Sequence, residues 1–225
     1  MLFRSNPTED YLYVDFKVHL IAKRKGLRLS PDLDLATIPA LMPAEVMKRM
    51  VWRVALGQYD LLGLTSVFLI QLKLIMRDLS GEEGRKLAWD EVIPTEIRDK
   101  FIDVLAKMDG VRKIKFPRCV VPSGVDESVK PDLLVFADGS TSAFCTVQYA
   151  RWKLLDGTYQ FRLIAGKARV APLKKLTVPR IELLGAVAGV RLAQQIQEHL
   201  GIEFGRRWFF TDSSAVLGML RGKST

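Results

Sequence analysis

The spacing of apolar and polar positions changes near the middle of the chain, from helical in the first part to strand-like in the second. Residues 11–24 alternate apolar and polar side chains in places, which predicts a strand, and the glycine and prolines of 22–43 predict an extended connection. Apolar residues at helical spacing then predict helices over 43–57, about 64–79 and 94–108. The first part is therefore predicted to be mainly helical after an N-terminal strand.

The second part begins with three apolar runs on short turns. Residues 133–138, 143–153 and 159–171 have strand character, and their short connections predict an antiparallel meander. A strong helical pattern follows over 177–201, with proline near its start and glycine at its end. A fourth apolar strand then ends in Asp212, and another helix opens after it. This order predicts an α/β domain with a mixed sheet.

A proline-rich stretch separates the two parts. Residues 116–131 contain three prolines, which is typical of a connection between domains. We therefore divide the chain into a first segment of 1–118, a linker of 119–130 and a second domain of 131–225.

Composition places the chain among globular proteins, with 48% hydrophobic and 26% charged residues. The most apolar run, 61–76, is too short and too polar to predict a membrane span, and no secretion signal is visible at the start. Cys119 and Cys145 lack the spacing of a metal site, so the sequence predicts reduced thiols without a disulfide. The expected location is the cytoplasm or the nucleus, without secretion.

Positive charge is concentrated in the second part. The whole chain carries a net charge of +9, and residues 130–225 hold 14 Lys and Arg against 7 Asp and Glu. Such an excess favours a polyanionic partner. The basic side chains between 165 and 180 are Lys167, Arg169, Lys174, Lys175 and Arg180. They form either a solvated loop or a set of phosphate contacts, and their place beside three acidic residues favours phosphate contacts.

Those acidic residues are Asp138, Glu182 and Asp212, at two predicted strand tips and one predicted helix start. Each has an ordinary explanation: a hairpin turn at Asp138-Gly139, a favourable charge in the first helical turn at Glu182, and a helix N-cap at Asp212. Their order along the chain is more specific. If the helix crosses the sheet, the three carboxylates meet at one end of it. Clustered carboxylates repel each other unless a cation is bound, and their hard oxygens suit Mg²⁺ or Mn²⁺.

The motifs around these acids resemble a known family. "FADGS", "PRIELLGA" and "FFTDSSAVL", in that order after a strand meander, resemble the ribonuclease H fold. The longer stretch "LIAGKARVAPLKKLTVPRIELLGAVAGVRLA" is similar to the ribonuclease H region of BEL/Pao-type retrotransposon polyproteins. In the first part, "RKGLRLSPDLDL", "GQYDLLGLTSVFLIQLKLIMRDL", "LAWDEVIP" and "IKFPRCVVP" resemble the segment that follows the reverse transcriptase palm in the same polyproteins.

The resemblance implies a reverse transcriptase C-terminal segment followed by a ribonuclease H-like domain that is incomplete at its C-terminus. It implies that Asp138, Glu182 and Asp212 are three of four metal-binding catalytic acids, and that the chain hydrolyses RNA in RNA/DNA hybrids with Mg²⁺ or Mn²⁺. Its partners would be the hybrid, or another nucleic acid, and the remainder of the polyprotein. No acid follows Asp212 in the sequence, so for lack of the fourth carboxylate the chain itself is expected to be a weak or inactive nuclease; the alternatives are a remnant that only binds nucleic acid and a structural module that meets a protein partner.

Overall fold

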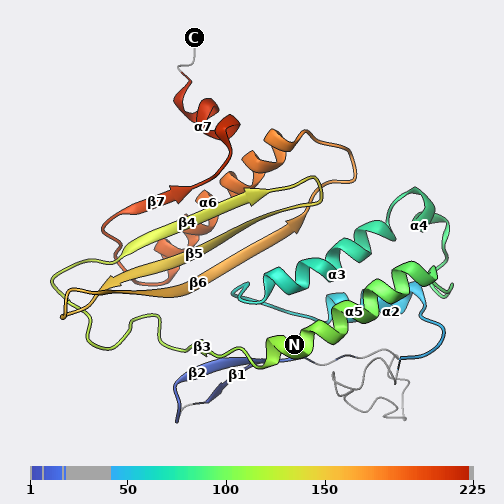
Figure 1. The fold of residues 1–225 in the computed structure, drawn as a ribbon, viewed down its shortest axis with the longest axis horizontal. Helices are drawn as coiled ribbons and strands as arrows, with labels where there is room; N and C mark the ends of the chain where they lie inside the picture. Colours follow the sequence, from blue (N-terminus) through green and yellow to red (C-terminus); the bar gives the residue numbers. More distant parts are fainter. Residues whose placement is uncertain (1, 7, 17, 19–41, 223–225) are drawn as a thin grey trace. The chain divides into compact units, whose positions relative to one another are not determined.

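The computed structural model describes residues 2–6, 8–16, 18 and 42–222 of the chain. They form two compact units, coloured along the sequence in Figure 1. The first unit comprises Met1–Leu61 and Val67–Arg118, and the second comprises Leu62–Ser66 and Cys119–Thr225. The described helices include none that is long and apolar enough to cross a membrane.

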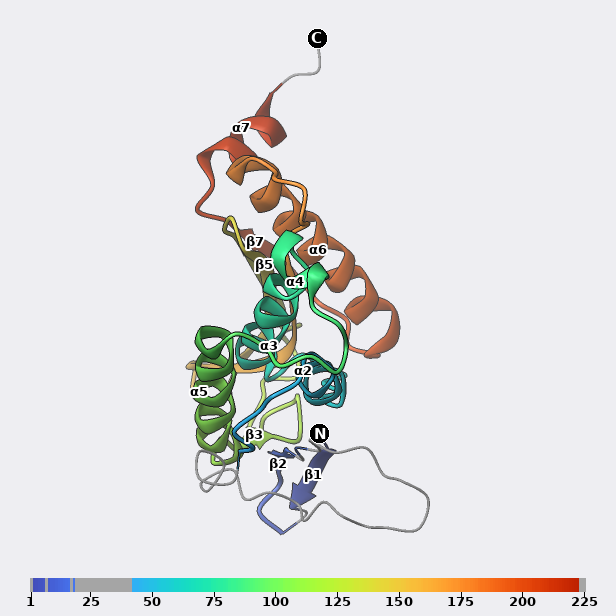
Figure 2. The ribbon, with the colours of Figure 1, turned by 90° about the vertical axis from the view of Figure 1, so that its right-hand side faces the viewer.

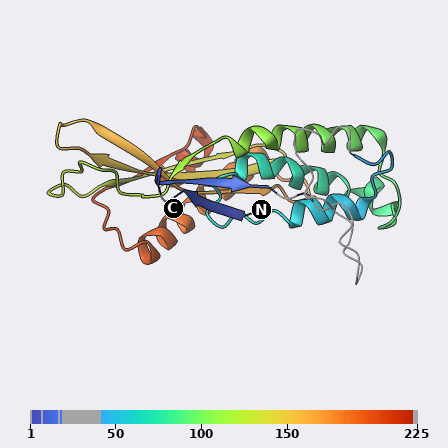
Figure 3. The same ribbon diagram turned by 90° about the horizontal axis from the view of Figure 1, so that it is seen from below.

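The first unit combines a small antiparallel sheet with helices. Its elements are β1 (Leu2–Asn6), β2 (Tyr11–Asp15), α2 (Lys48–Leu56), α3 (Ser66–Asp78), α4 (Glu82–Lys86), α5 (Thr95–Arg112) and β3 (Phe116–Pro117). The strands pair in the order β1-β2-β3, and α2, α3 and α5 lie side by side (Figure 3). Large side chains such as Leu72 of α3 and Phe101 and Leu105 of α5 are completely buried in its core. The apolar stripes at helical spacing therefore bury the faces that the sequence predicted.

The predicted helices of this unit are present with two boundaries changed, because the helix expected to end at residue 108 continues to Arg112 and the helix expected from Pro43 starts later. The helices expected over 64–79 and 94–108 are α3 and α5, whereas the helix expected from Pro43 begins only at Lys48. The backbone before it is extended, because Val46 accepts a hydrogen bond from the Ile93 amide and the Lys48 amide donates to Glu91.

The strand predicted over 11–24 is confirmed for Tyr11–Asp15, while residue 17 and residues 19–24 lie outside the described part. Most of the predicted connection over 22–43 also lies outside it.

The second unit contains the predicted meander, helix and fourth strand. Its elements are β4 (Asp132–Gly139), β5 (Ala143–Lys153), β6 (Tyr159–Val170), α6 (Val178–His199), β7 (Arg207–Phe210) and α7 (Ser214–Arg221). The strand order is β6-β5-β4-β7, with antiparallel pairing throughout the meander and parallel pairing between β4 and β7. Residues 119–130 belong to this unit, and Val120 and Val125 pack against its core.

Helix α6 crosses the sheet through a stripe of small residues. Gly185, Gly189 and Ala193 are buried on the face toward the sheet, and Figure 2 shows α6 running along one side of the strands. A side chain at Gly189 would meet Val135 of β4 at 3.0 Å. These small residues therefore allow α6 to approach the sheet closely.

A short piece of the first half of the chain also belongs to the second unit. The Leu62 carbonyl accepts a hydrogen bond of 2.8 Å from the Gly166 amide on β6. Gly63 has a φ of 70°, and a Cβ on it would overlap the Gly166 backbone. Glycine is therefore required at this position by both conformation and space.

Candidate functional site

Asp138 is the penultimate residue of β4. It pairs with Cys145 and Gly139 pairs with Phe144, so both still belong to the ladder, and the turn lies at 140–142. The interpretation of Asp138-Gly139 as a hairpin turn is therefore wrong. The Asp138 side chain is exposed, and its Oδ1 accepts a hydrogen bond of 2.6 Å from the Gly139 amide.

Glu182 lies one turn inside α6, because the helix begins at Val178 and has no acid in its first turn. The prediction of a first-turn position is therefore wrong, and the helix dipole alone does not explain this acid, since its effect fades beyond the first turn. The backbone places Glu182 beside the end of β4. A Cβ on Gly139 would lie 2.7 Å from the Glu182 nitrogen, and one on Gly185 would lie 2.8 Å from the Asp138 carbonyl oxygen.

Asp212 follows β7 in the connection to α7, two residues beyond the strand end at Phe210. The N-cap of α7 is Ser213, whose Oγ accepts a hydrogen bond from the Val216 amide, so the N-cap interpretation of Asp212 is wrong. The same Ser213 hydroxyl donates a hydrogen bond of 2.5 Å to Oε2 of Glu182. Because β4 and β7 are parallel, their carboxyl ends lie at the same end of the sheet.

The backbone thus brings the three predicted acids to one end of the sheet, but their side chains as placed do not surround one cation. Within residues 42–222 there is no group of three His, Cys, Asp or Glu side chains able to hold a metal. One reason is strand alternation: Val135 and Ala137 of β4 lie toward Gly189 of α6, so the next residue, Asp138, points to the opposite face of the sheet.

The chemistry of the donor set nevertheless suits a divalent cation. Three carboxylates supply hard oxygen ligands, and no described Lys or Arg forms an ion pair with Asp138, Glu182 or Asp212. Partial burial, together with the nearby Asp138 charge, raises the pKa of the Cys145 thiol. Both cysteines of the chain are free thiols.

The predicted basic residues lie at this same end of the sheet. Lys167 and Arg169 belong to the last part of β6, and the pairing register places Gly139, Phe144 and Arg169 in one row across three strands. Neighbouring strands are about 5 Å apart, so the Arg169 backbone lies about 10 Å from that of Gly139. Lys174 and Lys175 are exposed in the connection that leads into α6.

Arg180 lies in the first turn of α6 and is exposed. In the part of the chain that the structure describes, none of the five basic side chains is in an ion pair with an acid. Their charge is therefore available to an anionic partner.

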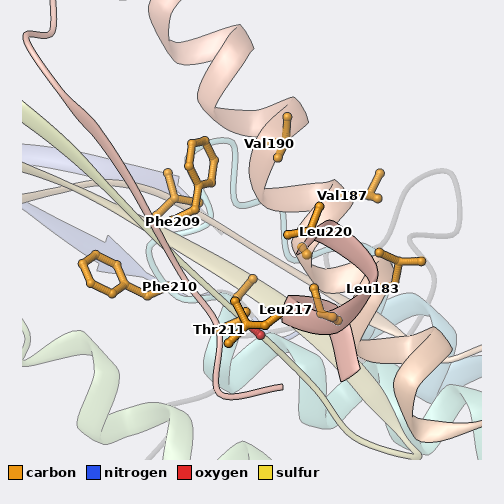
Figure 4. Close-up of a pocket in the computed structure, with 12 residues that line it drawn as sticks. Leu183, Val187, Val190, Phe209, Phe210, Thr211, Leu217 and Leu220 are labelled. Carbon is orange, nitrogen blue, oxygen red and sulfur yellow. The ribbon is translucent and has the colours of Figure 1, made fainter. Parts of the chain in front are cut away.

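An apolar groove of about 300 Å³ runs between α6, α7 and β7. Figure 4 shows Leu217 and Leu220 of α7 beside α6, with Phe209 of β7 across the groove. Val216, near the start of α7, is completely buried, whereas Leu220 near its end is 73% exposed. Helix α7 is therefore held chiefly through its first turn, next to Asp212 and Ser213.

Ser213 is the residue of this site that the sequence analysis missed. The signal was present in "TDSSAVLGML", where a serine precedes an apolar helical run. Both Asp212 and Ser213 are suitable N-cap residues, and the sequence pattern does not decide between them.

The strand order, the crossing helix and the parallel fourth strand define a ribonuclease H-like α/β fold. The model of the family described as "Pao retrotransposon-like RNaseH-like domain" matches residues 47–213, so the chain belongs to this family. The match begins within the first unit and ends at Ser213. No curated protein sequence matches the chain significantly.

Two solved structures are similar to the chain. One is a foamy viral protease-reverse transcriptase in complex with dsDNA, with 12% identity and a TM-score of 0.45 over 85% of this chain. The other is the dRH form of a foamy viral protease-reverse transcriptase, also with double-stranded DNA, with 12% identity and a TM-score of 0.42 over 82%. The chain spans 36% and 29% of the length of these two proteins.

Proposed function

We propose that the second unit is a ribonuclease H that hydrolyses the RNA strand of RNA/DNA hybrids during reverse transcription of a retrotransposon. The observation that carries this proposal is the meeting of β4, α6 and the β7–α7 connection at one end of the sheet. It places the backbones of Asp138, Glu182 and the Asp212 connection at one end of the sheet, and no described Lys or Arg forms an ion pair with these acids. Three unbalanced carboxylates are costly unless a cation neutralises them.

Asp138, Glu182 and Asp212 would hold Mg²⁺ or Mn²⁺. When bound at such a site, divalent ions activate a water molecule and stabilise the leaving oxygen of a phosphodiester. The chain's own contribution is to fix the three acids on a strand, a helix and a short connection. Exposure of Asp138 and Asp212 leaves the site accessible to a large substrate.

The basic residues at this end of the sheet would hold the substrate backbone. Lysine and arginine contacts to phosphates give affinity without sequence preference. Recognition of a hybrid would then depend on its 2′-hydroxyl groups and helical shape, since the deep, narrow major groove of A-like helices hides its base edges.

A cleavage assay tests this function. The 225-residue protein is mixed with an RNA/DNA hybrid, a DNA duplex or an RNA duplex of the same sequence, with Mg²⁺ or with a chelator. We expect weak cleavage that is confined to the RNA strand of the hybrid and occurs only with the metal. Cleavage that persists in the chelator, or that attacks the DNA duplex equally, would contradict the proposal.

A second candidate is a domain that binds hybrids without cutting them. The five basic side chains favour it, because none of them is in an ion pair with a described acid and phosphate contacts need no metal. Binding of the hybrid with no cleavage at any Mg²⁺ or Mn²⁺ concentration would support this alternative.

The basic surface leads to a prediction about salt. Replacing Lys167, Arg169, Lys174 and Lys175 with alanine should weaken hybrid binding and flatten its dependence on salt, because each phosphate contact releases condensed cations. In duplex DNA each lost contact reduces the slope of log K against log salt by about 0.9. Binding is measured by fluorescence anisotropy at several salt concentrations. An unchanged slope would show that these residues do not contact phosphates.

We further propose that the first unit is the C-terminal segment of a reverse transcriptase that precedes the nuclease in the chain. The remainder of the polyprotein would then be a partner of this chain, and reverse transcription would place it in the cytoplasm or the nucleus.

A further inference from the structure

Ser213 uses both hydrogen-bonding capacities of its hydroxyl group. The residue is 5% exposed, and its Oγ accepts a hydrogen bond of 3.1 Å from the Val216 amide, which caps α7. Its own hydroxyl proton is donated to Oε2 of Glu182, 31 positions earlier in the chain. Its amide is also engaged, since it donates to Oγ1 of Thr211. Such a residue is held in one orientation.

The bond to Glu182 joins two of the three elements that carry the acids. Helix α7 is anchored through Val216 in its first turn, while Leu220 is largely exposed, so the polar link lies where the helix is fixed best. Donation to Oε2 leaves Oε1 of Glu182 without a hydrogen bond from any described residue. The bonded oxygen is thus oriented, and the other is available to a cation.

We propose that Ser213 is a positioning residue of the metal site. Its hydroxyl orients the Glu182 carboxylate and holds the neighbouring Asp212 in place beside it. This inference rests on the proposed function, because it gives Ser213 a role only if a divalent cation binds at these acids. Groups that hydrogen-bond to metal ligands commonly affect metal affinity by about 10–100-fold.

Capping and donation are separable. At an N-cap, glycine replaces serine at a cost of only a few tenths of a kcal/mol although it has no side-chain acceptor, whereas alanine costs about 1 kcal/mol. Neither glycine nor alanine donates a side-chain hydrogen bond, while threonine both caps and donates. If Ser213 has only a structural role, Mn²⁺ affinity should fall in the order of capping ability, as thermal stability does. If Ser213 is a positioning residue, Mn²⁺ affinity should depend on whether the side chain at this position carries a hydroxyl group.

The experiment measures Mn²⁺ binding to the full chain by calorimetry, and thermal unfolding without metal, for wild type, Ser213→Gly, Ser213→Ala and Ser213→Thr. We expect Mn²⁺ affinity to fall about 10–100-fold in both the glycine and alanine variants, and to be retained by threonine. Thermal stability should fall clearly in the alanine variant and little in the glycine variant. Ser214→Ala, at the exposed neighbouring serine, is the matched control and should bind like wild type.

If Ser213→Gly binds Mn²⁺ as tightly as wild type, or if affinity follows thermal stability across the series, the positioning role is wrong while the proposed function stands. If wild type itself binds no Mn²⁺, the metal site of the proposed function is wrong, and the positioning role of Ser213 is wrong as well. The two failures are distinguished by the wild-type titration alone.

Discussion

Replacing Asp138 with asparagine should reduce Mg²⁺-dependent cleavage of a hybrid by about 10²–10³-fold or more, a loss typical of removing one preorganised stabilising group. Asparagine keeps the size of the side chain but loses the charge that a hard cation requires. The fold should not suffer, because Asp138 is exposed and forms no ion pair with a described residue. The measurements are the initial cleavage rate and the midpoint of thermal unfolding.

The matched control for this variant is Glu198→Gln. Glu198 is exposed on α6, the helix that carries Glu182, but lies near its other end. The Glu198→Gln variant should therefore cleave the hybrid at the same rate as wild type. Equal activity of wild type and Asp138→Asn would show that Asp138 does not belong to the site, whatever the activity of the chain.

Gly139→Ala should disturb both stability and the candidate site. The added Cβ would lie 2.7 Å from the Glu182 nitrogen and 2.8 Å from both the Glu182 Cα and the Ile181 carbonyl carbon. These are backbone atoms of α6, which cannot turn aside as a flexible side chain can, so α6 and β4 must separate. Overpacking of this kind costs about 1–3 kcal/mol, which chemical denaturation measures. Mn²⁺ affinity should also fall, because the shift separates Glu182 from the end of β4.

Gly218→Ala provides the comparison for Gly139→Ala. Gly218 lies in α7 with no atom within 4 Å of an added Cβ, so alanine should stabilise the helix by about 0.5–1 kcal/mol. If Gly139→Ala is as stable as wild type and binds Mn²⁺ equally, the close approach of β4 to α6 is not what forms the site.

The sheet and its crossing helix were predictable because their signals are local. Continuous apolar runs on short turns gave β4, β5 and β6, and a long helical pattern with proline at its start gave α6. The position of the acids at one end of the sheet followed from that order alone. The detailed place of Glu182 did not, since helix boundaries depend on which residue adopts the capping conformation.

Features that depend on distant pairing could not be read from the sequence. The assignment of Leu62–Ser66 to the second unit depends on a hydrogen bond between Leu62 and Gly166, which are far apart in the chain. The late start of α2 depends on pairing with residues 91–93. The choice of Ser213 over Asp212 as N-cap is likewise tertiary, because the Ser213 hydroxyl also binds Glu182.

The most direct test of the central claim is a crystal structure of the protein with Mn²⁺, recorded with anomalous scattering. We predict an anomalous peak at the end of the sheet, ligated by oxygens of Asp138, Glu182 and Asp212, with the Ser213 hydroxyl bonded to Glu182. Convergence would require the Asp138 side chain to turn toward the other two. A peak located elsewhere, or no peak at saturating Mn²⁺ with the three carboxylates still apart, would contradict the assignment of these acids as a metal site.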